Sequence, residues 1–148
     1  MTTDRFGVCY MGLSLDVAFA ESVLHDLTAD ALGFNIPQSE VNSRFLVRFD
    51  GEPLVLANFT GASLLRHGAD GQISTTLDYS ITQAWSAAVH AHPQNVDGIL
   101  YVSRHLNTGK AIAFYNRAGG KLRQGTTISL SQGLGLGAVL GRFGVQLA

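Results

Sequence analysis

The stretch DGILYVSR, residues 97–104, decides most of the fold. Its first two residues signal a turn, and the four apolar residues that follow predict a strand buried on both faces. Ser103 stands directly at the end of this strand. Further short strands are predicted at residues 7–11 and 110–115, each of which borders a glycine.

A helix is predicted over residues 15–27, because Ser14 is a favourable N-cap and Asp16 places a negative charge in the first turn. Apolar residues recur at helical spacing and predict one buried stripe, made of Val17, Ala20, Leu24 and Leu27. Glu21 falls on the same stripe. Burial of an unpaired carboxylate is costly. Glu21 therefore lies either at the edge of a cleft or on a helix rotated to leave it in solvent.

The rest of the chain supplies more strands than helices. Residues 44–49 and 54–59 flank the turn signal Asp50-Gly51 and predict a hairpin. A second helix is expected at residues 81–91. Further predictions are a loop at 33–42, a short helical turn within 60–71, a strand at 126–130, a weak helix at 133–141 and an edge strand at 145–147. This pattern predicts an α+β domain with a mixed or mainly antiparallel sheet and a few helices.

Length and charge exclude several classes of function. The chain has 148 residues, the size of one domain, and a formal net charge of −1. Direct nucleic-acid binding draws its affinity from clustered Lys and Arg, which the sequence lacks. Residues 124–141 are uncharged but rich in Ser, Thr and Gly, so no membrane span is expected. The single Cys9 and the absence of a secretory pattern at the start make the cytoplasm the expected compartment.

The surface is expected to be partly covered by another chain. Charged residues make up 14% of the sequence, well below the roughly 25% of an average domain. So little charge leaves apolar surface that a partner, a second copy of this chain, or both would cover.

Common catalytic and ligand-binding motifs are missing. The glycines at 133, 135 and 137 lack the strand, the βαβ unit and the downstream acid of a dinucleotide-binding loop. His90 and His92 have no third ligand at a recognisable spacing, so no metal site is predicted. The sequence also contains neither a nucleophile elbow nor a phosphate-binding loop.

Two longer stretches carry a resemblance to a known family. Residues 5–11 (RFGVCYM) and 14–21 (SLDVAFAE) resemble the arginine-aromatic start, the tyrosine-containing strand and the alanine-rich helix with a glutamate that characterise the RES domain. Residues 97–104 resemble that family's glycine-isoleucine-tyrosine strand, which ends in a serine. Weaker similarity at residues 78–79, 82–85, 109–110 and 113–114 extends the likeness over most of residues 1–148.

The resemblance implies an ADP-ribosyltransferase-like fold and a toxin of a bacterial toxin–antitoxin pair. Members of the family are toxins that bind NAD and break its nicotinamide–ribose bond. Some members of the family that this sequence resembles degrade NAD by hydrolysis or phosphorolysis. Others resemble transferases that attach ADP-ribose to a protein. The usual partner is a helix-turn-helix antitoxin that occludes the cleft.

Residue by residue, the resemblance implies that Glu21 and Ser103 are catalytic and that Arg5 and Tyr10 bind NAD. Family members have several tens of residues before this point, including an earlier arginine, so the amino-terminal part is expected to be short or missing. Arg5 would then replace that arginine. The alternative is a catalytically impaired module that binds NAD or the antitoxin.

These residue types suit the implied chemistry. A carboxylate can stabilise the positive charge that develops on the ribose as nicotinamide leaves, and can hold a ribose hydroxyl. The planar fork of an arginine can clamp a pyrophosphate. A tyrosine offers a flat face for nicotinamide or adenine. A serine can position either the carboxylate or a substrate hydroxyl.

Overall fold

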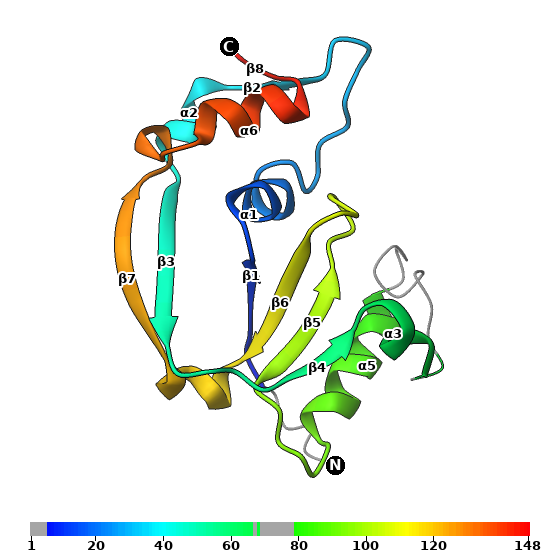
Figure 1. The fold of residues 1–148 in the computed structure, drawn as a ribbon. Helices are drawn as coiled ribbons and strands as arrows, with labels where there is room; N and C mark the ends of the chain where they lie inside the picture. The colour runs from blue at the N-terminus through cyan, green and yellow to red at the C-terminus, as the bar shows by residue number, and fades with distance from the viewer. Residues whose placement is uncertain (1–5, 67, 69–78) are drawn as a thin grey trace.

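Four strands form the central sheet of the computed structural model, which describes residues 6–66, 68 and 79–148 (Figure 1). Their order across the sheet is β1 (Val8–Gly12), β6 (Lys110–Tyr115), β5 (Gly98–Val102) and β4 (Leu56–Phe59). The β1–β6 and β6–β5 pairs are antiparallel, and the β5–β4 pair is parallel. The α+β class and the mixed sheet predicted from the sequence are therefore confirmed.

Both faces of this sheet are apolar. Helices α3 (Gly61–Arg66) and α5 (Tyr79–His90) lie on one face, where Trp85 and Val89 pack against a buried cluster that includes Ile99 and Tyr115. The opposite face packs its own cluster around Ile112 and Phe114. None of the helices in the described ranges is long and apolar enough to cross a bilayer.

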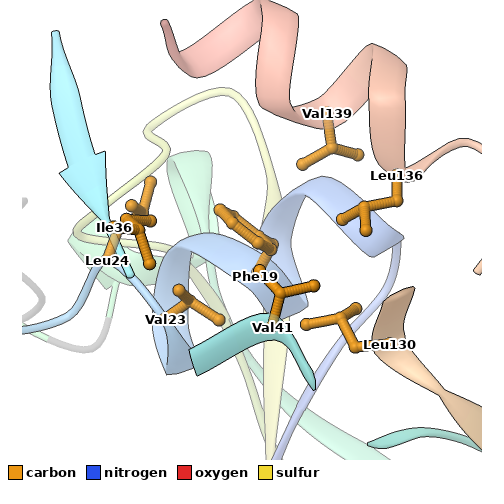
Figure 2. Close-up of a cluster of buried hydrophobic side chains, with 8 residues drawn as sticks. All are labelled: Phe19, Val23, Leu24, Ile36, Val41, Leu130, Leu136 and Val139. Atoms are coloured by element: carbon orange, nitrogen blue, oxygen red, sulfur yellow. The ribbon is translucent and has the colours of Figure 1, made fainter. Parts of the chain in front are cut away.

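Apart from the two clusters on the faces of the sheet, a separate group of buried apolar side chains, called the second cluster below, lies around the first helix, α1 (Leu15–Ser22) (Figure 2). Around it lie α2 (Gln38–Asn42), α6 (Leu136–Phe143) and the parallel pair β2 (Phe34–Ile36) and β8 (Val145–Leu147). The buried members are Phe19, Val23, Leu24, Ile36, Val41, Leu130, Leu136 and Val139. The predicted edge strand at 145–147 is confirmed, whereas residues 33–42, predicted as a loop, contain β2 and α2.

Helix α1 is shorter than its predicted range of residues 15–27. It ends at Ser22, after which the amides of Val23 and Leu24 both donate to the carbonyl of Phe19. These two apolar side chains are buried in the second cluster. Tertiary packing thus overrides the helical periodicity, and Leu27 is exposed rather than part of a buried stripe.

The predicted hairpin between residues 44–49 and 54–59 is wrong. Strand β3 (Phe45–Gly51) pairs instead with β7 (Leu122–Ser129), and β4 runs parallel to β5. The buried carboxylate of Asp97 accounts for the difference, because it accepts hydrogen bonds from the Val55 amide (2.7 Å) and from Lys121 (2.8 Å). Asp97 thereby directs the chain after β3 toward β5. The 3₁₀ turns η1 (Asn116–Lys121) and η2 (Leu130–Gln132) flank β7.

Two close approaches place α1 at the end of the sheet. Ser14 caps the helix by accepting a hydrogen bond from the Val17 amide, as predicted. A Cβ on Gly12 would lie 2.5 Å from the backbone nitrogen of Ala18, and a Cβ on Gly109 would lie 2.2 Å from a methyl group of Val17. The helix can therefore rest against β1 and the start of β6 only because both positions are glycine.

We expect Gly12→Ala to move α1. The added methyl group meets backbone rather than a flexible side chain, so the free energy of unfolding should fall by about 1–3 kcal/mol in urea denaturation. Gly119→Ala is the matched control, because a Cβ there has no neighbour within 4 Å. A loss no larger than the control's would show that Gly12 does not set the helix position.

We expect Asp97→Asn to destabilise the fold by about 2–3 kcal/mol at pH 7, since it leaves Lys121 without its charged partner. Burial acts to raise the pKa of Asp97, but the hydrogen bonds from Lys121 and Val55 and the charges of Lys121 and Arg117 outweigh it and lower the pKa. Because the pKa of Asp97 is lower in the folded state, its ionised carboxylate stabilises the fold at pH values above the unfolded pKa of 3.8. This contribution to stability is lost as the pH falls through the folded pKa.

Urea denaturation from pH 7 to pH 3 therefore tests the role of Asp97. The stability difference between the wild type and Asp97→Asn should be constant above about pH 5 and shrink below about pH 4. A difference that persists undiminished at pH 3 would contradict the role of the ionised carboxylate.

Candidate active site

A hydrogen bond joins two of the predicted site residues from distant parts of the chain. Ser103 follows β5, and its hydroxyl donates to Oε1 of Glu21 on α1 over 2.5 Å. The serine is 1% exposed, and the glutamate is half-buried. Of the two positions that the helical spacing left open for Glu21, the structure shows a paired, half-buried one rather than one in open solvent.

The surroundings of Ser103 fix the direction of its hydroxyl. Its oxygen accepts hydrogen bonds from the amides of His105 (3.2 Å) and Leu106 (3.1 Å). A serine oxygen has two lone pairs and one hydrogen, and both lone pairs are now occupied. The hydrogen is thus directed to Glu21, whose carboxylate is the acceptor.

Two tyrosines lie beside this pair on one face of the sheet. Strand β6 lies between the two tyrosines. Tyr10 on β1 lies opposite Ala113 of β6, and Tyr101 on β5 lies opposite Ala111 of β6. Ala111 also lies opposite Gly12 of β1. Residues directly opposite each other, and those two apart on one strand, share a face. Tyr10 and Tyr101 therefore project from the same face, and small residues occupy the positions between them.

The Glu21 carboxylate affects the pKa of Tyr101. Burial raises the pKa of Tyr101, and the neighbouring Glu21 carboxylate and Tyr10 raise it further. Its phenol therefore stays protonated through the physiological range and can donate a hydrogen bond. Tyr10, by contrast, is 68% exposed. The ring of Tyr10 is thus available to stack on a flat ligand.

The structure brings two of the four predicted site residues into contact and places a third, Tyr10, on the neighbouring face of the sheet. Glu21 and Ser103 are in direct contact, and Tyr10 lies on the same face of the sheet as Tyr101, whose pKa the nearby Glu21 carboxylate helps to raise. Arg5 lies outside the described residues. Tyr101 was missed as a site residue by sequence reasoning. Its position on β5, two residues before Ser103, is the signal that could have placed both side chains on one side of the sheet.

A pocket of about 420 Å³ has Glu21 in its lining. It lies between the end of α1, β2 and α2, and its lining includes Glu21, His25, Asn35, Glu40 and Arg44. The carboxylate of Glu40 is paired with Arg44 at 3.0 Å. Glu21 thus lines this pocket and also contacts Ser103, so a small molecule in the pocket can reach its side chain.

The chemistry of this arrangement is that of a held carboxylate. One oxygen of Glu21 accepts a hydrogen bond from the serine hydroxyl, and the residues that the structure describes make no hydrogen bond to the other, which can therefore contact a ligand. Partial burial strengthens its interaction with a positive charge. Within the described ranges, no three His, Cys, Asp or Glu side chains are grouped to hold a metal ion.

Comparison with known proteins identifies the family. The curated proteins and the solved structures give no significant match to this chain. The family model of the RES domain matches residues 1–131 of the 148. This match includes β1, the helix α1 with Glu21, and the central strand β5, which Ser103 follows. The chain belongs to the RES-domain family, whose members are associated with NAD and with toxin–antitoxin pairs.

Proposed function

We propose that this chain is the toxin of a bacterial toxin–antitoxin pair, which acts in the cytoplasm by binding NAD and cleaving its nicotinamide–ribose bond. The observation that carries the proposal is the Glu21 carboxylate held by the hydroxyl of the buried Ser103. Membership of the RES-domain family supports the same conclusion. NAD is the substrate, and the reaction as proposed needs no metal.

In the proposed reaction the bond between ribose C1′ and the nicotinamide nitrogen breaks, and its electron pair stays on nicotinamide, which becomes neutral. The sugar transiently carries the positive charge. Glu21 would stabilise this charge with its other carboxylate oxygen or accept a hydrogen bond from the ribose 2′-hydroxyl. Ser103 would orient the carboxylate, since its hydrogen is already directed to Glu21.

The tyrosines would hold the rest of the substrate. The exposed ring of Tyr10 offers a stacking face for nicotinamide or adenine, and Tyr101 supplies a protonated hydroxyl near Glu21. Arg5 would bind the pyrophosphate, as the family resemblance implies. The acceptor that attacks C1′ and loses a proton is water, phosphate or a side chain of a target protein. Chromatography of the products separates these outcomes as ADP-ribose, ADP-ribose phosphate or labelled protein.

A helix-turn-helix antitoxin is the partner we propose. Strand β3 leaves large apolar side chains exposed at alternate positions, among them Phe45, which is 66% exposed, Val47 and Phe49. This surface supports the expectation, drawn from the low charge of the sequence, that another chain covers part of the molecule.

We expect Glu21→Gln to lower the rate of nicotinamide release by about 10²–10³-fold, because the amide has no charge to offset the sugar cation. Nicotinamide is measured by chromatography after incubation of the purified protein with NAD, alone and with phosphate or a lysate as acceptor. Glu52→Gln is the control, since Glu52 is an exposed residue of the segment after β3. Full activity of Glu21→Gln would remove Glu21 from the mechanism, and no release by the wild type with any acceptor would contradict the proposed function.

We expect Ser103→Ala to lower kcat about tenfold or more with little change in KM, because the carboxylate loses the donor that orients it. The variant also leaves two amides without their acceptor, so the free energy of unfolding should fall by about 1–3 kcal/mol. Ser39→Ala, at an exposed position of α2, is the matched control. An unchanged kcat in a folded Ser103→Ala protein would refute the orienting role.

A further inference from the structure

Two histidines contact each other next to the Glu21–Ser103 pair. His25 lies in the turn after α1, four residues beyond Glu21, and His105 lies two residues beyond Ser103. Nδ1 of His25 and Nε2 of His105 are 3.1 Å apart, a hydrogen-bonding distance. The ring centroids are 5.0 Å apart, with an interplanar angle of 61°. The end of α1 and the segment after β5 are thus joined a second time.

We propose that His25 and His105 form a clasp that positions Glu21 for the reaction, and that the clasp opens when both rings are protonated. His25 and His105 are positioning residues, since they act through Glu21 and Ser103. The effect on turnover rests on the proposed cleavage of NAD, whereas the clasp itself can be observed without any substrate.

The clasp and the catalytic pair share a frame. His105 donates its main-chain amide to the Ser103 hydroxyl and binds His25 through its side chain. The turn that carries His25 follows directly from the helix that carries Glu21. When the histidine contact is lost, the orientation of Glu21 relies more heavily on the hydrogen bond that it accepts from Ser103. A displacement of about 1 Å at a catalytic group can cost 10²-fold in rate.

A hydrogen bond between two imidazoles needs one donor and one acceptor nitrogen. Asp26 lies 3.5 Å from Nε2 of His25 and favours a proton on that nitrogen. In the neutral pair, Nε2 of His105 is then the donor and Nδ1 of His25 is the acceptor. One added proton still leaves an acceptor. Two added protons remove it and place two positive rings in contact, so the clasp breaks.

Burial and the charged groups around His105 set the pH at which the clasp opens. Burial lowers the pKa of His105, and the charges of His25 and Arg104 lower it further, while Glu21 and Asp26 act in the opposite direction. On the pocket side, Glu40 and Arg44 of α2 line the same pocket as His25 and pair with each other. The net lowering keeps His105 neutral near pH 7. The clasp is therefore closed at neutral pH and opens as the pH falls below the ordinary histidine range.

Three variants of the full chain test the clasp by steady-state NAD cleavage between pH 5 and pH 8. His25→Ala should lower kcat about 10- to 100-fold at pH 7.5 with little change in KM. His105→Gln should keep kcat at pH 7.5 within about threefold of the wild type, because an amide side chain can both donate and accept a hydrogen bond. In this variant kcat should fall less at acid pH, because only one of the two clasp residues can still be protonated. His92→Ala, in the loop after α5, should match the wild type in both respects.

A second measurement keeps the clasp separate from the enzymatic proposal. Nitrogen-15 NMR of the two imidazoles should show coupled titration in the wild type, with the second protonation displaced below the ordinary histidine range. Independent titration of both rings near about 6.5 would overturn the clasp, as would a His25→Ala protein with wild-type kcat and pH profile. Loss of turnover on adding a chelator would also overturn it, since a metal ion would then lie between the nitrogens. Coupled titration without any nicotinamide release would instead fail the proposed function.

Discussion

One buried hydroxyl constrains the candidate site. The oxygen of Ser103 accepts hydrogen bonds from two main-chain amides, so its hydroxyl group acts as a donor. The acceptor of that hydrogen bond is the Glu21 carboxylate. This arrangement orients the Glu21 carboxylate at the end of the sheet through one of its oxygens, and among the described residues no hydrogen bond is made to the other. A charge fixed in this way needs little reorganisation when a positive charge develops beside it, which is how preorganised sites lower barriers.

The rest of the fold can be understood as the means of bringing these two side chains together. Helix α1 reaches its place because Gly12 and Gly109 have no side chains to hold it away from the sheet. The second hydrophobic cluster then covers the outer side of α1 (Figure 2). Asp97, at the start of β5, gathers β4 and η1 around the strand that ends in Ser103. Stability and site geometry therefore rest on the same strand.

Local patterns in the sequence were sufficient for the central strand, the cap at Ser14 and the long helix before β5, because each depends on neighbours in the chain. They failed where a distant residue decided the outcome. The end of α1 is set by packing in the second cluster, and the partner of β3 is set by the capture of the following segment by Asp97. For the site, helical spacing singled out Glu21 but not its partner. Ser103 came from the family resemblance, and the role of Tyr101 required the strand register.

The most direct measurement of the central claim is a crystal structure of the Glu21→Gln protein with NAD bound, since the slowed variant should retain the intact substrate. We predict that ribose C1′ lies against the residue 21 side chain, with the nicotinamide or adenine ring on Tyr10. NAD bound elsewhere, with its ribose remote from residue 21, would contradict the claim that this carboxylate stabilises the departing sugar.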